Sequence, residues 1–426
     1  MYFCMTANIF HKFFFFHIFA NRKIIKNINS GIIVHRMKNL DKRGAYAQIL
    51  LSAVFVCVSC TKESCSNISS EYKTEELPVL KDGVINELDT NEYTMKVEAC
   101  LSVPDSSTIL SCCRMKYDDG HYYLQSEGKN QTIWVFDSVG NFVSKLGERG
   151  RRKNEYQTDI TDWFHVNGSD DVIVYERKAR KVHVFSLDGS QSESFTLESS
   201  PNAVGVLDRG KLFCSFYQKE AKEGLQLAIL TENEDIASRL IFLGQDMEFI
   251  PSDYSFYKIK DELFHVPCFA DSAIVFRGDT VERVVKFRFE DEFITKEIKE
   301  KAFRDELESY RDFTGIKGIT TYYETSRYNV LSFVIGSYNV NQLVDKTDGR
   351  QYRFIGSLPK GLSLSTEFCV RGDKIYYVIT KENVEETRAL SDADVYEGQF
   401  KQSCKTLQDI YSGKVQLPAI VSIEIK

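Results

Sequence analysis

Two similar segments, 49 residues apart, constrain the fold of this chain more than any other feature. The segment DDGHYYLQSEGKNQTIWVFDSVGNFV aligns with SDDVIVYERKARKVHVFSLDGSQSE, and Phe136 and Phe185 hold the same place in both. Each segment consists of short strand-forming runs, and each Phe precedes a turn of the kind that closes a β-hairpin. A repeated unit of several strands cannot bury its apolar face alone, so it has to pack against further copies of itself.

Weaker copies of the unit continue to the end of the chain. Asp208–Phe213 and Asp261–Val266 each begin one, and the 30 Phe and 22 Tyr residues favour strands throughout. A repeat of about 50 residues with several strands is typical of a β-propeller blade. Residues 83–426 are therefore predicted to form an all-β fold, a six-bladed β-propeller of four-stranded antiparallel blades. A strand near Tyr93–Val103 and the carboxy-terminal AIVSIEIK are expected to close the ring.

One segment interrupts the strand pattern. Residues 292–312 are dense in Lys and Glu, and they repeat apolar residues at helical spacing. The apolar positions are Ile294, Ile298, Ala302, Leu307 and Tyr310. This pattern predicts an amphipathic helical insertion that packs on a blade edge, with a partner-binding helix as the alternative.

The amino-terminal region differs from the rest of the chain in charge. Residues 1–59 contain 8 Lys or Arg and one acid, Asp41, which leaves 46 basic and 60 acidic residues and a net charge of −14 for the remainder. A body this acidic is a poor candidate for nucleic-acid binding, which depends on neutralising phosphates. We therefore expect no nucleic-acid partner.

Met37 begins a segment with the pattern of a secretory signal. Lys38, Lys42 and Arg43 precede an uncharged stretch, residues 44–59, that is shorter than the ~20 residues of a membrane-spanning helix. We interpret residues 1–36 as a mis-assigned extension and residues 37–59 as a signal peptide; a genuine long leader is the alternative.

The end of the signal segment suggests a lipid anchor. The run Cys57-Val58-Ser59-Cys60 resembles the lipobox of bacterial lipoproteins, although Cys57 stands where Leu is usual. The resemblance implies that Cys60 is the site of lipid attachment, and an unmodified secreted protein is the alternative. Residues 60–82 are polar and without periodicity, so they are predicted to form a flexible tether.

The first clear repeats also resemble a known family. The stretch IWVFDSVGNFVSKLGERGRRKNEYQTDITDWFHVNGSDDVIVYERKARKVHVFSLDG is similar to the six-bladed β-propeller lipoproteins of Bacteroides-type bacteria, relatives of NHL-like and TolB-like propellers. Its loop keeps the family's Glu-Tyr end at Glu155-Tyr156 but has basic residues in place of Pro-Gly. The resemblance implies a propeller over about residues 83–426 and an export route, while substrates in this family are largely undefined.

Propellers bind ligands where inter-blade loops converge, and one loop here is dense in basic and aromatic residues. Its candidate ligand-binding residues are Arg149, Arg151, Arg152, Tyr156 and Trp163. The basic side chains could hold carboxylates or phosphates, and the aromatic rings could stack on sugars; a solvated loop with a packed Tyr156 is the alternative. A second candidate is Tyr322, Tyr323 and Arg327, for which a cross-strand aromatic pair is the competing interpretation.

Motifs for metal, redox or nucleophilic chemistry are missing from the sequence. The eleven Cys include no CxxC pair, and we expect mostly free buried thiols, with a disulfide from Cys100 to Cys112 or Cys113 as the alternative. The four remaining His, at positions 121, 165, 183 and 265, are isolated in strand-like runs and are interpreted as structural. The paired acids Asp118-Asp119 are assigned to a turn. No cofactor, metal site or catalytic residue is therefore predicted.

Together these patterns predict a monomeric propeller, lipid-anchored to the cell envelope and facing the periplasm or the outside. We expect a binding or scaffolding module for an envelope protein, a peptide or a glycan, with no membrane contact except through its lipid. The alternative is a lyase or hydrolase that acts on a carbohydrate or related small molecule in the channel. Three or more convergent carboxylate, Asn or His groups at the channel mouth would favour the enzyme.

Overall fold

A computed structural model describes residues 72–83, 91–104, 112–126, 131–152, 155–216, 225–231, 236–242, 256–267, 270–303, 307–355, 368–390 and 404–426. All of them belong to one compact unit, Ile68–Lys426. The predicted extension, the signal peptide and Cys60 lie outside the described residues. No helix among the described residues is long and apolar enough to cross a membrane.

Six antiparallel sheets form the blades. Blade 1 contains β3 (Cys112–Asp118), β4 (His121–Ser126), β5 (Ile133–Asp137) and β6 (Phe142–Leu146). Blade 2 contains β9 (Asp162–His165), β10 (Asp171–Glu176), β11 (Lys181–Ser186) and β12 (Gln191–Thr196). Blade 3 contains β13 (Ala203–Gly205), β14 (Lys211–Ser215), β15 (Leu225–Thr231) and β16 (Ile236–Phe242).

The other three blades follow the same order of strands. Blade 4 contains β17 (Phe256–Ile259), β18 (Glu262–His265), β19 (Ser272–Arg277) and β20 (Thr280–Lys286). Blade 5 contains β21 (Ile316–Glu324), β22 (Tyr328–Ile335), β23 (Tyr338–Asp345) and β24 (Gln351–Ile355). Blade 6 contains β25 (Cys369–Arg371), β26 (Lys374–Ile379), β27 (Ala419–Ile425) and β2 (Tyr93–Cys100). The predicted all-β, six-bladed architecture is confirmed.

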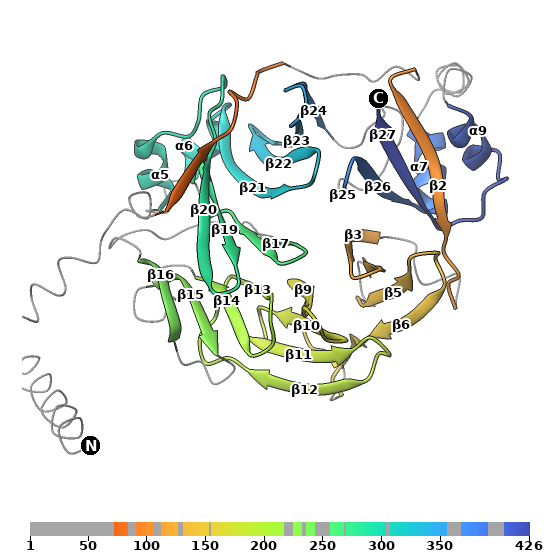
Figure 1. Cartoon of the computed structure of the whole chain (residues 1–426), viewed down its shortest axis with the longest axis horizontal. Coiled ribbons are helices and arrows are strands. Elements are labelled where there is room, and N and C mark those ends of the chain that lie inside the picture. Colours follow the sequence, from red (N-terminus) through yellow and green to blue (C-terminus); the bar gives the residue numbers. More distant parts are fainter. Residues whose placement is uncertain are drawn as a thin grey trace, which may run out of the picture. The chain divides into compact units, whose positions relative to one another are not determined.

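The first strand of each blade lies at the centre of the ring (Figure 1). Contacts join β9 to β13, β13 to β17, β17 to β21 and β25 to β3. A hydrogen bond from Val370 N to Tyr323 Oη, 3.1 Å long, links blades 6 and 5, and Arg114 pairs with Asp162 between blades 1 and 2. The innermost strands therefore face one another around a central channel.

Strands from both ends of the sequence close the ring. In blade 6 the carboxy-terminal β27 pairs with β26 on one side and with β2 on the other. The prediction that these two segments close the ring is confirmed. Closure of this kind joins two distant parts of the chain in one sheet and covers a strand edge that would otherwise stay open.

A recurring bulge explains the sequence repeat. Phe136, Phe185 and Phe276 are each the next-to-last residue of the third strand of their blade, and each follows a shift of register toward the fourth strand. All three side chains are fully buried. In each pairing the extra residue lies on the fourth strand, just after the turn, so the bulge bends that strand beside the Phe. The 49-residue spacing of Phe136 and Phe185 thus marks equivalent positions in blades 1 and 2.

The predicted tether across residues 60–82 is wrong for its last part. Strand β1 (Lys73–Glu76) adds to blade 4 as a fifth strand, parallel to β20, and appears in orange-red beside it in Figure 1. Glu75 lies 3.3 Å from Arg283 and Glu76 lies 2.7 Å from Arg288. Leu80 is fully buried and bridges to Phe289. These contacts attach the segment to blade 4.

The predicted helix over residues 292–312 is confirmed only in part. Helices α5 (Lys296–Phe303) and α6 (Leu307–Asp312) occupy this segment. Its first residues are not helical, because Phe293 forms a β-bridge with Ile316 and Ile294 N donates to the Ile316 carbonyl. Two further helices, α7 (Lys381–Leu390) and α9 (Lys405–Tyr411), lie between β26 and β27 and were not predicted.

The cysteines that the structure describes with their side chains are free thiols. Cys214 and Cys369 are buried, as predicted from their apolar strand patterns. Cys100 is exposed and free, so the alternative of a disulfide from this residue is wrong.

Candidate functional site

Charged side chains alternate along β3, the innermost strand of blade 1. Arg114, Lys116 and Asp118 occupy every second position, so they point to the same face of the strand. Arg114 is 5% exposed, because this face lies against the innermost strands of other blades rather than in open solvent. The central channel therefore has a charged wall.

Asp162 on β9 is the carboxylate that compensates two of these charges. Its Oδ1 lies 3.1 Å from Arg114 Nη2 and 2.5 Å from Lys116 Nζ, and it also accepts a 2.7 Å bond from the Trp163 amide. The Asp162 side chain has no exposed surface. Buried ions are tolerated when they are paired and hydrogen-bonded in this way.

Burial changes the protonation of Lys116. Removal of the ammonium from solvent lowers the pKa of Lys116 to about 7, although the Asp162 carboxylate opposes the shift. Lys116 also donates a 2.7 Å bond to the Trp163 carbonyl and lies 4.8 Å from the centroid of the Trp163 ring. The channel thus holds a lysine that titrates near neutral pH.

A second ion pair lies on the opposite side of the same cluster. Lys258 on β17 is 2.7 Å from Asp118 Oδ2 and donates to the His165 carbonyl. The His165 ring nitrogens lie 3.9 Å from Asp118 and 3.8 Å from Asp119. Burial lowers the pKa of His165 below its ordinary value, which favours a neutral imidazole.

Two adjoining cavities occupy this part of the channel. We call the smaller one the chamber; its volume is about 20 Å³, and its lining residues are Lys116, Tyr117, Asp118, Tyr123, Trp163, Phe164, His165, Tyr257 and Lys258. We call the larger one the mouth pocket, with a volume of about 760 Å³. They share Tyr117, Asp118, Tyr257 and Lys258, so the chamber adjoins the mouth pocket.

Turns from blades 1, 4, 5 and 6 surround the mouth pocket with charges of both signs. Its basic residues are Lys258, Lys260, Arg277, Arg283, Lys346 and Arg371, and its acidic residues are Asp118, Asp119, Asp261, Glu262 and Glu324. Arg283 lies 2.9 Å from Glu324 and 3.2 Å from Glu262. Much of this charge is therefore already paired within the protein.

Two cations of the mouth pocket have no acidic partner among the described residues. They are Lys260, in a turn with positive φ (55°), and Arg371, whose guanidinium lies 3.9 Å above the Tyr117 ring centroid. A stacked guanidinium keeps its fork of N–H donors free for a carboxylate. The neighbouring thiol is not a nucleophile at neutral pH, because burial raises the pKa of Cys369 to about 12.

Comparison with known protein families identifies the fold family. The family model DUF5128, described as a 6-bladed β-propeller, matches residues 75–409. The chain belongs to this DUF5128 family. The match covers all or part of each of the six blades found in the structure.

Two solved structures are similar to this DUF5128 propeller at low sequence identity. A candidate exported protein of Bacteroides fragilis has a TM-score of 0.65 and 14% identity, over 83% of this chain and 100% of that chain. A member of the DUF4221 family from Bacteroides vulgatus has a TM-score of 0.45 and 10% identity, over 79% of this chain and 99% of that chain. No curated protein matches the chain.

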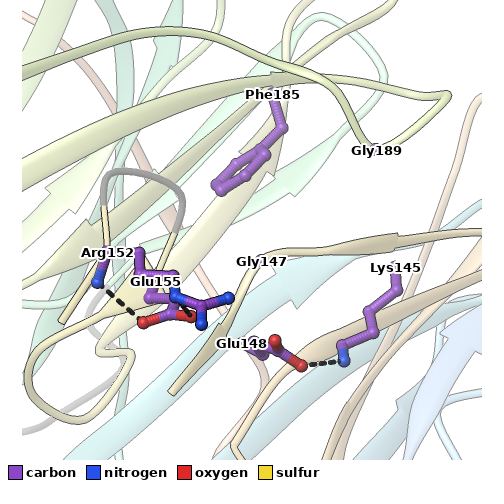
Figure 2. A pocket seen from close by; sticks show the side chains of 7 residues that line it. All are labelled: Lys145, Gly147, Glu148, Arg152, Glu155, Phe185 and Gly189. Atoms are coloured by element: carbon purple, nitrogen blue, oxygen red, sulfur yellow. Dashed lines mark hydrogen bonds and ion pairs between the residues drawn. The ribbon is translucent and has the colours of Figure 1, made fainter. Parts of the chain in front are cut away.

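The loop proposed from the sequence lies elsewhere in this DUF5128 propeller, between blades 1 and 2. Strands β7 (Glu148–Arg149) and β8 (Glu155–Tyr156) close it in parallel. Figure 2 shows a pocket there, with a volume of about 440 Å³. Arg152 lies in its lining beside Glu155, and Lys145 pairs with Glu148. Of the five predicted ligand-binding residues, only Arg152 lines this pocket.

The other predicted residues do not converge on one site. Arg149 pairs with Asp159 at 2.7 Å, and Arg151 is exposed. Tyr156 is fully buried, and its hydroxyl donates a 2.5 Å bond to the Leu146 carbonyl. Trp163 belongs to the channel, where it is 1% exposed and packs against Arg114 and Lys116.

The second predicted set is also structural. Tyr322 and Tyr323 are buried, and Tyr323 stacks on Tyr257 of blade 4 with ring centroids 3.8 Å apart. This stack joins two blades, so the interpretation as a cross-strand pair within one sheet is wrong. Arg327 pairs with Asp345 at 2.8 Å.

Apart from Trp163, the channel residues were missed, although the sequence carries a signal for them. Three charges alternate within the seven residues of β3, CCRMKYD, next to apolar strands of the same blade. Asp118 was assigned to a turn, whereas it ends β3 and pairs with Lys258. Within the residues that the structure describes, no group of three or more His, Cys, Asp and Glu side chains is arranged to hold a metal ion.

Proposed function

We propose that this protein is a binding module whose ligand occupies the mouth pocket of the propeller channel. The observation that carries the proposal is a cavity of about 760 Å³ in which Arg371 and Lys260 have no acidic partner among the described residues. Ligand sites of proteins usually have volumes of roughly 300–1,000 Å³ and a few convergent polar groups. The mouth pocket has this size and this composition.

A peptide fits the pocket better than a glycan. Sugar rings need a free aromatic face, but Arg371 covers one face of Tyr117, and Tyr257 stacks on Tyr323. The rim offers charges of both signs, including Asp119 and Asp261. A peptide, or a terminus of a protein partner, presents charges of both signs in one short segment and can satisfy them together.

The binding proposal is tested with libraries of short peptides and of glycans, added to the purified full-length protein. We expect peptides to raise the melting temperature, because a ligand that binds only the folded state stabilises it. Arg371→Ala should abolish the effect. The matched control is Arg152→Ala, whose side chain is 90% exposed in the loop between blades 1 and 2. Loss of binding in the control, with binding retained by Arg371→Ala, would place the ligand in that loop and refute the mouth pocket.

We further propose that the protein is exported and anchored by a lipid on Cys60. The basic segment at Lys38–Arg43, the short apolar stretch and the Ser59-Cys60 junction support this route. The candidate exported protein of Bacteroides fragilis, which shares the fold, is consistent with it. Such an anchor would present the propeller to partners in the cell envelope.

The anchor is tested by membrane fractionation. Cys60→Ala should leave the protein unlipidated and release it from the membrane fraction, whereas Cys57→Ala should fractionate as the unchanged protein does. If Cys60→Ala remains in the membrane fraction, the lipid-anchor proposal is refuted.

A second candidate function is an enzyme that acts in the channel, a lyase or hydrolase for a carbohydrate or related small molecule. The observation that favours it is that His165 lies near two carboxylates, with Nδ1 3.9 Å from Asp118 and Nε2 3.8 Å from Asp119. A neutral imidazole beside two carboxylates suits acid–base chemistry. If the protein turns over any library compound and Asp119→Asn abolishes this turnover, the enzyme function is supported. Binding without turnover favours the binding module.

A further inference from the structure

We propose that the chamber is a subsite for one oxygen atom of a carboxylate group, and that ligands of the mouth pocket enter with a free carboxylate. The inference rests on the proposed binding function and names the chemistry of its ligand. It depends on the polar groups that line the chamber, on its size and on its charge.

Three polar side-chain atoms of residues that line the chamber have no hydrogen-bond partner within the part of the chain that the structure describes. They are Tyr123 Oη, Trp163 Nε1 and His165 Nε2, and each belongs to a side chain that is at least nine-tenths buried. Buried polar groups in proteins nearly always have a partner, so three in one cavity indicate a group that binds there. Because Trp163 Nε1–H can only donate, its partner has to be an acceptor.

The size of the chamber limits that acceptor to a small group. A volume of about 20 Å³ is enough for one water molecule or one oxygen atom. The chamber shares four lining residues with the mouth pocket, so an oxygen inside it can belong to a larger ligand outside. A carboxylate has this shape, with one oxygen that enters and a second that faces the pocket.

The charges around the chamber favour a negatively charged oxygen. Lys258 and Lys116, the latter with a pKa of about 7, line it, and Arg371, which has no acidic partner among the described residues, stacks on Tyr117, which lines both cavities. Of the acids, Asp162 is bound by Arg114 and Lys116, and Asp118 is bound by Lys258. Asp119, on the mouth side, lies 3.8 Å from His165 and is the remaining opposing charge. Hydrogen bonds to a charged acceptor in such a site are stronger than bonds to a neutral one.

The chamber can be tested with sodium acetate as the probe. The protein has 2 Trp, so ¹⁵N-tryptophan labelling gives one indole signal for the chamber and one for Trp134. Trp134 Nε1 is also buried without a partner, but it lies outside the chamber lining, which makes it an internal control. We expect acetate to shift the Trp163 signal saturably and to leave Trp134 unchanged, with sodium chloride at equal ionic strength as the reference. No shift at Trp163, or equal shifts at both, overturns the proposal.

Removal of one chamber hydroxyl should weaken acetate binding. Tyr123→Phe should raise the dissociation constant of acetate about tenfold, because it removes one hydrogen bond to a charged group. The matched control is Tyr328→Phe, since the Tyr328 hydroxyl is also buried without a partner but lines neither cavity. Equal affinity of the two variants for acetate would contradict the assignment of the chamber.

A comparison of peptide libraries separates this inference from the proposed function. We expect peptides with a free C-terminal carboxylate to bind and the same peptides with a C-terminal amide to lose most of their affinity. If both sets bind equally, the binding module stands and the carboxylate inference fails. If neither set binds while acetate still shifts Trp163, the peptide function fails and the chamber assignment stands.

Discussion

The pair between Arg114 and Asp162 allows a direct test of how the innermost strands are held together. Asp162→Asn removes the negative charge and keeps the shape of the side chain. Arg114 is then left at 5% exposure without the Asp162 carboxylate, with a 3.2 Å bond to the Thr161 carbonyl and with the Trp163 ring centroid at 4.7 Å. Arginine cannot lose its proton in response, so the buried charge remains.

The expected loss in the free energy of unfolding follows from the burial of Arg114 and Asp162. At pH 8 the pKa of Lys116, about 7, leaves most of this lysine neutral, so the loss comes chiefly from Arg114. Removal of one partner of a buried ion pair costs roughly 3–5 kcal/mol. Asp159→Asn is the matched control, because the Asp159 side chain is 54% exposed and pairs with Arg149 at the surface. An exposed pair contributes at most about 1 kcal/mol.

The assay is urea unfolding at pH 8, followed by tryptophan fluorescence. We expect Asp162→Asn to lower the free energy of unfolding by about 3–5 kcal/mol and Asp159→Asn by about 1 kcal/mol or less. The double variant Arg114→Met/Asp162→Leu should recover most of the loss, since an apolar pair replaces a buried ion pair at little cost. The reasoning is refuted if Asp162→Asn loses no more than Asp159→Asn, or if the double variant is as unstable as the single one.

Two further predictions concern the fifth strand of blade 4 and the buried lysine. Leu80→Ala should lower the free energy of unfolding by about 2–5 kcal/mol, because Leu80 is fully buried. The control Val79→Ala, at a residue that is 45% exposed, should lower it by less than about 1 kcal/mol in the same urea assay. Similar losses for the two variants would show that this segment does not pack as described. Burial lowers the pKa of Lys116 from 10.5 to about 7, so between these pH values the unfolded chain binds a proton that the folded protein does not. The contribution of Lys116 should therefore raise the free energy of unfolding by about 2 kcal/mol from pH 7 to pH 9. Lys116→Met should lack this contribution. If urea titrations give the variant and the unchanged protein the same pH dependence of the free energy of unfolding, the lowered pKa of Lys116 is contradicted.

The parts of the fold that could be predicted from the sequence are those that arise from short sequence patterns repeated along the chain. Phe136 and Phe185 recur because they hold the same place in the third strand of both blades, where the side chain is fully buried in the core beside a bulge of the fourth strand. The pairing of β2 with β27 was predictable for a related reason, since a ring of blades has to close and both ends of the repeat region carry strand patterns.

The parts that were missed depend on partners far away in the sequence. The residues of β1, KTEE, have no strand pattern of their own, and they form a strand because β20 supplies its edge and Arg283 and Arg288 pair with Glu75 and Glu76. The start of the predicted helix was lost to a similar contact, the bridge from Phe293 to Ile316. Local periodicity carries no information about such partners.

The candidate site was missed for a different physical reason. A strand with alternating charges, as in Arg114, Lys116 and Asp118, normally has one face in water. Charges on a face in water need no partner within the protein, so the pattern did not indicate a site. In a closed ring the same face of an innermost strand meets other innermost strands, so each charge has to find a counter-charge such as Asp162 or Lys258. Basic side chains in a surface loop, by contrast, can remain solvated, as Arg151 and Arg152 do. Position within the blade therefore decides whether alternating charges face solvent or are paired with residues of other innermost strands.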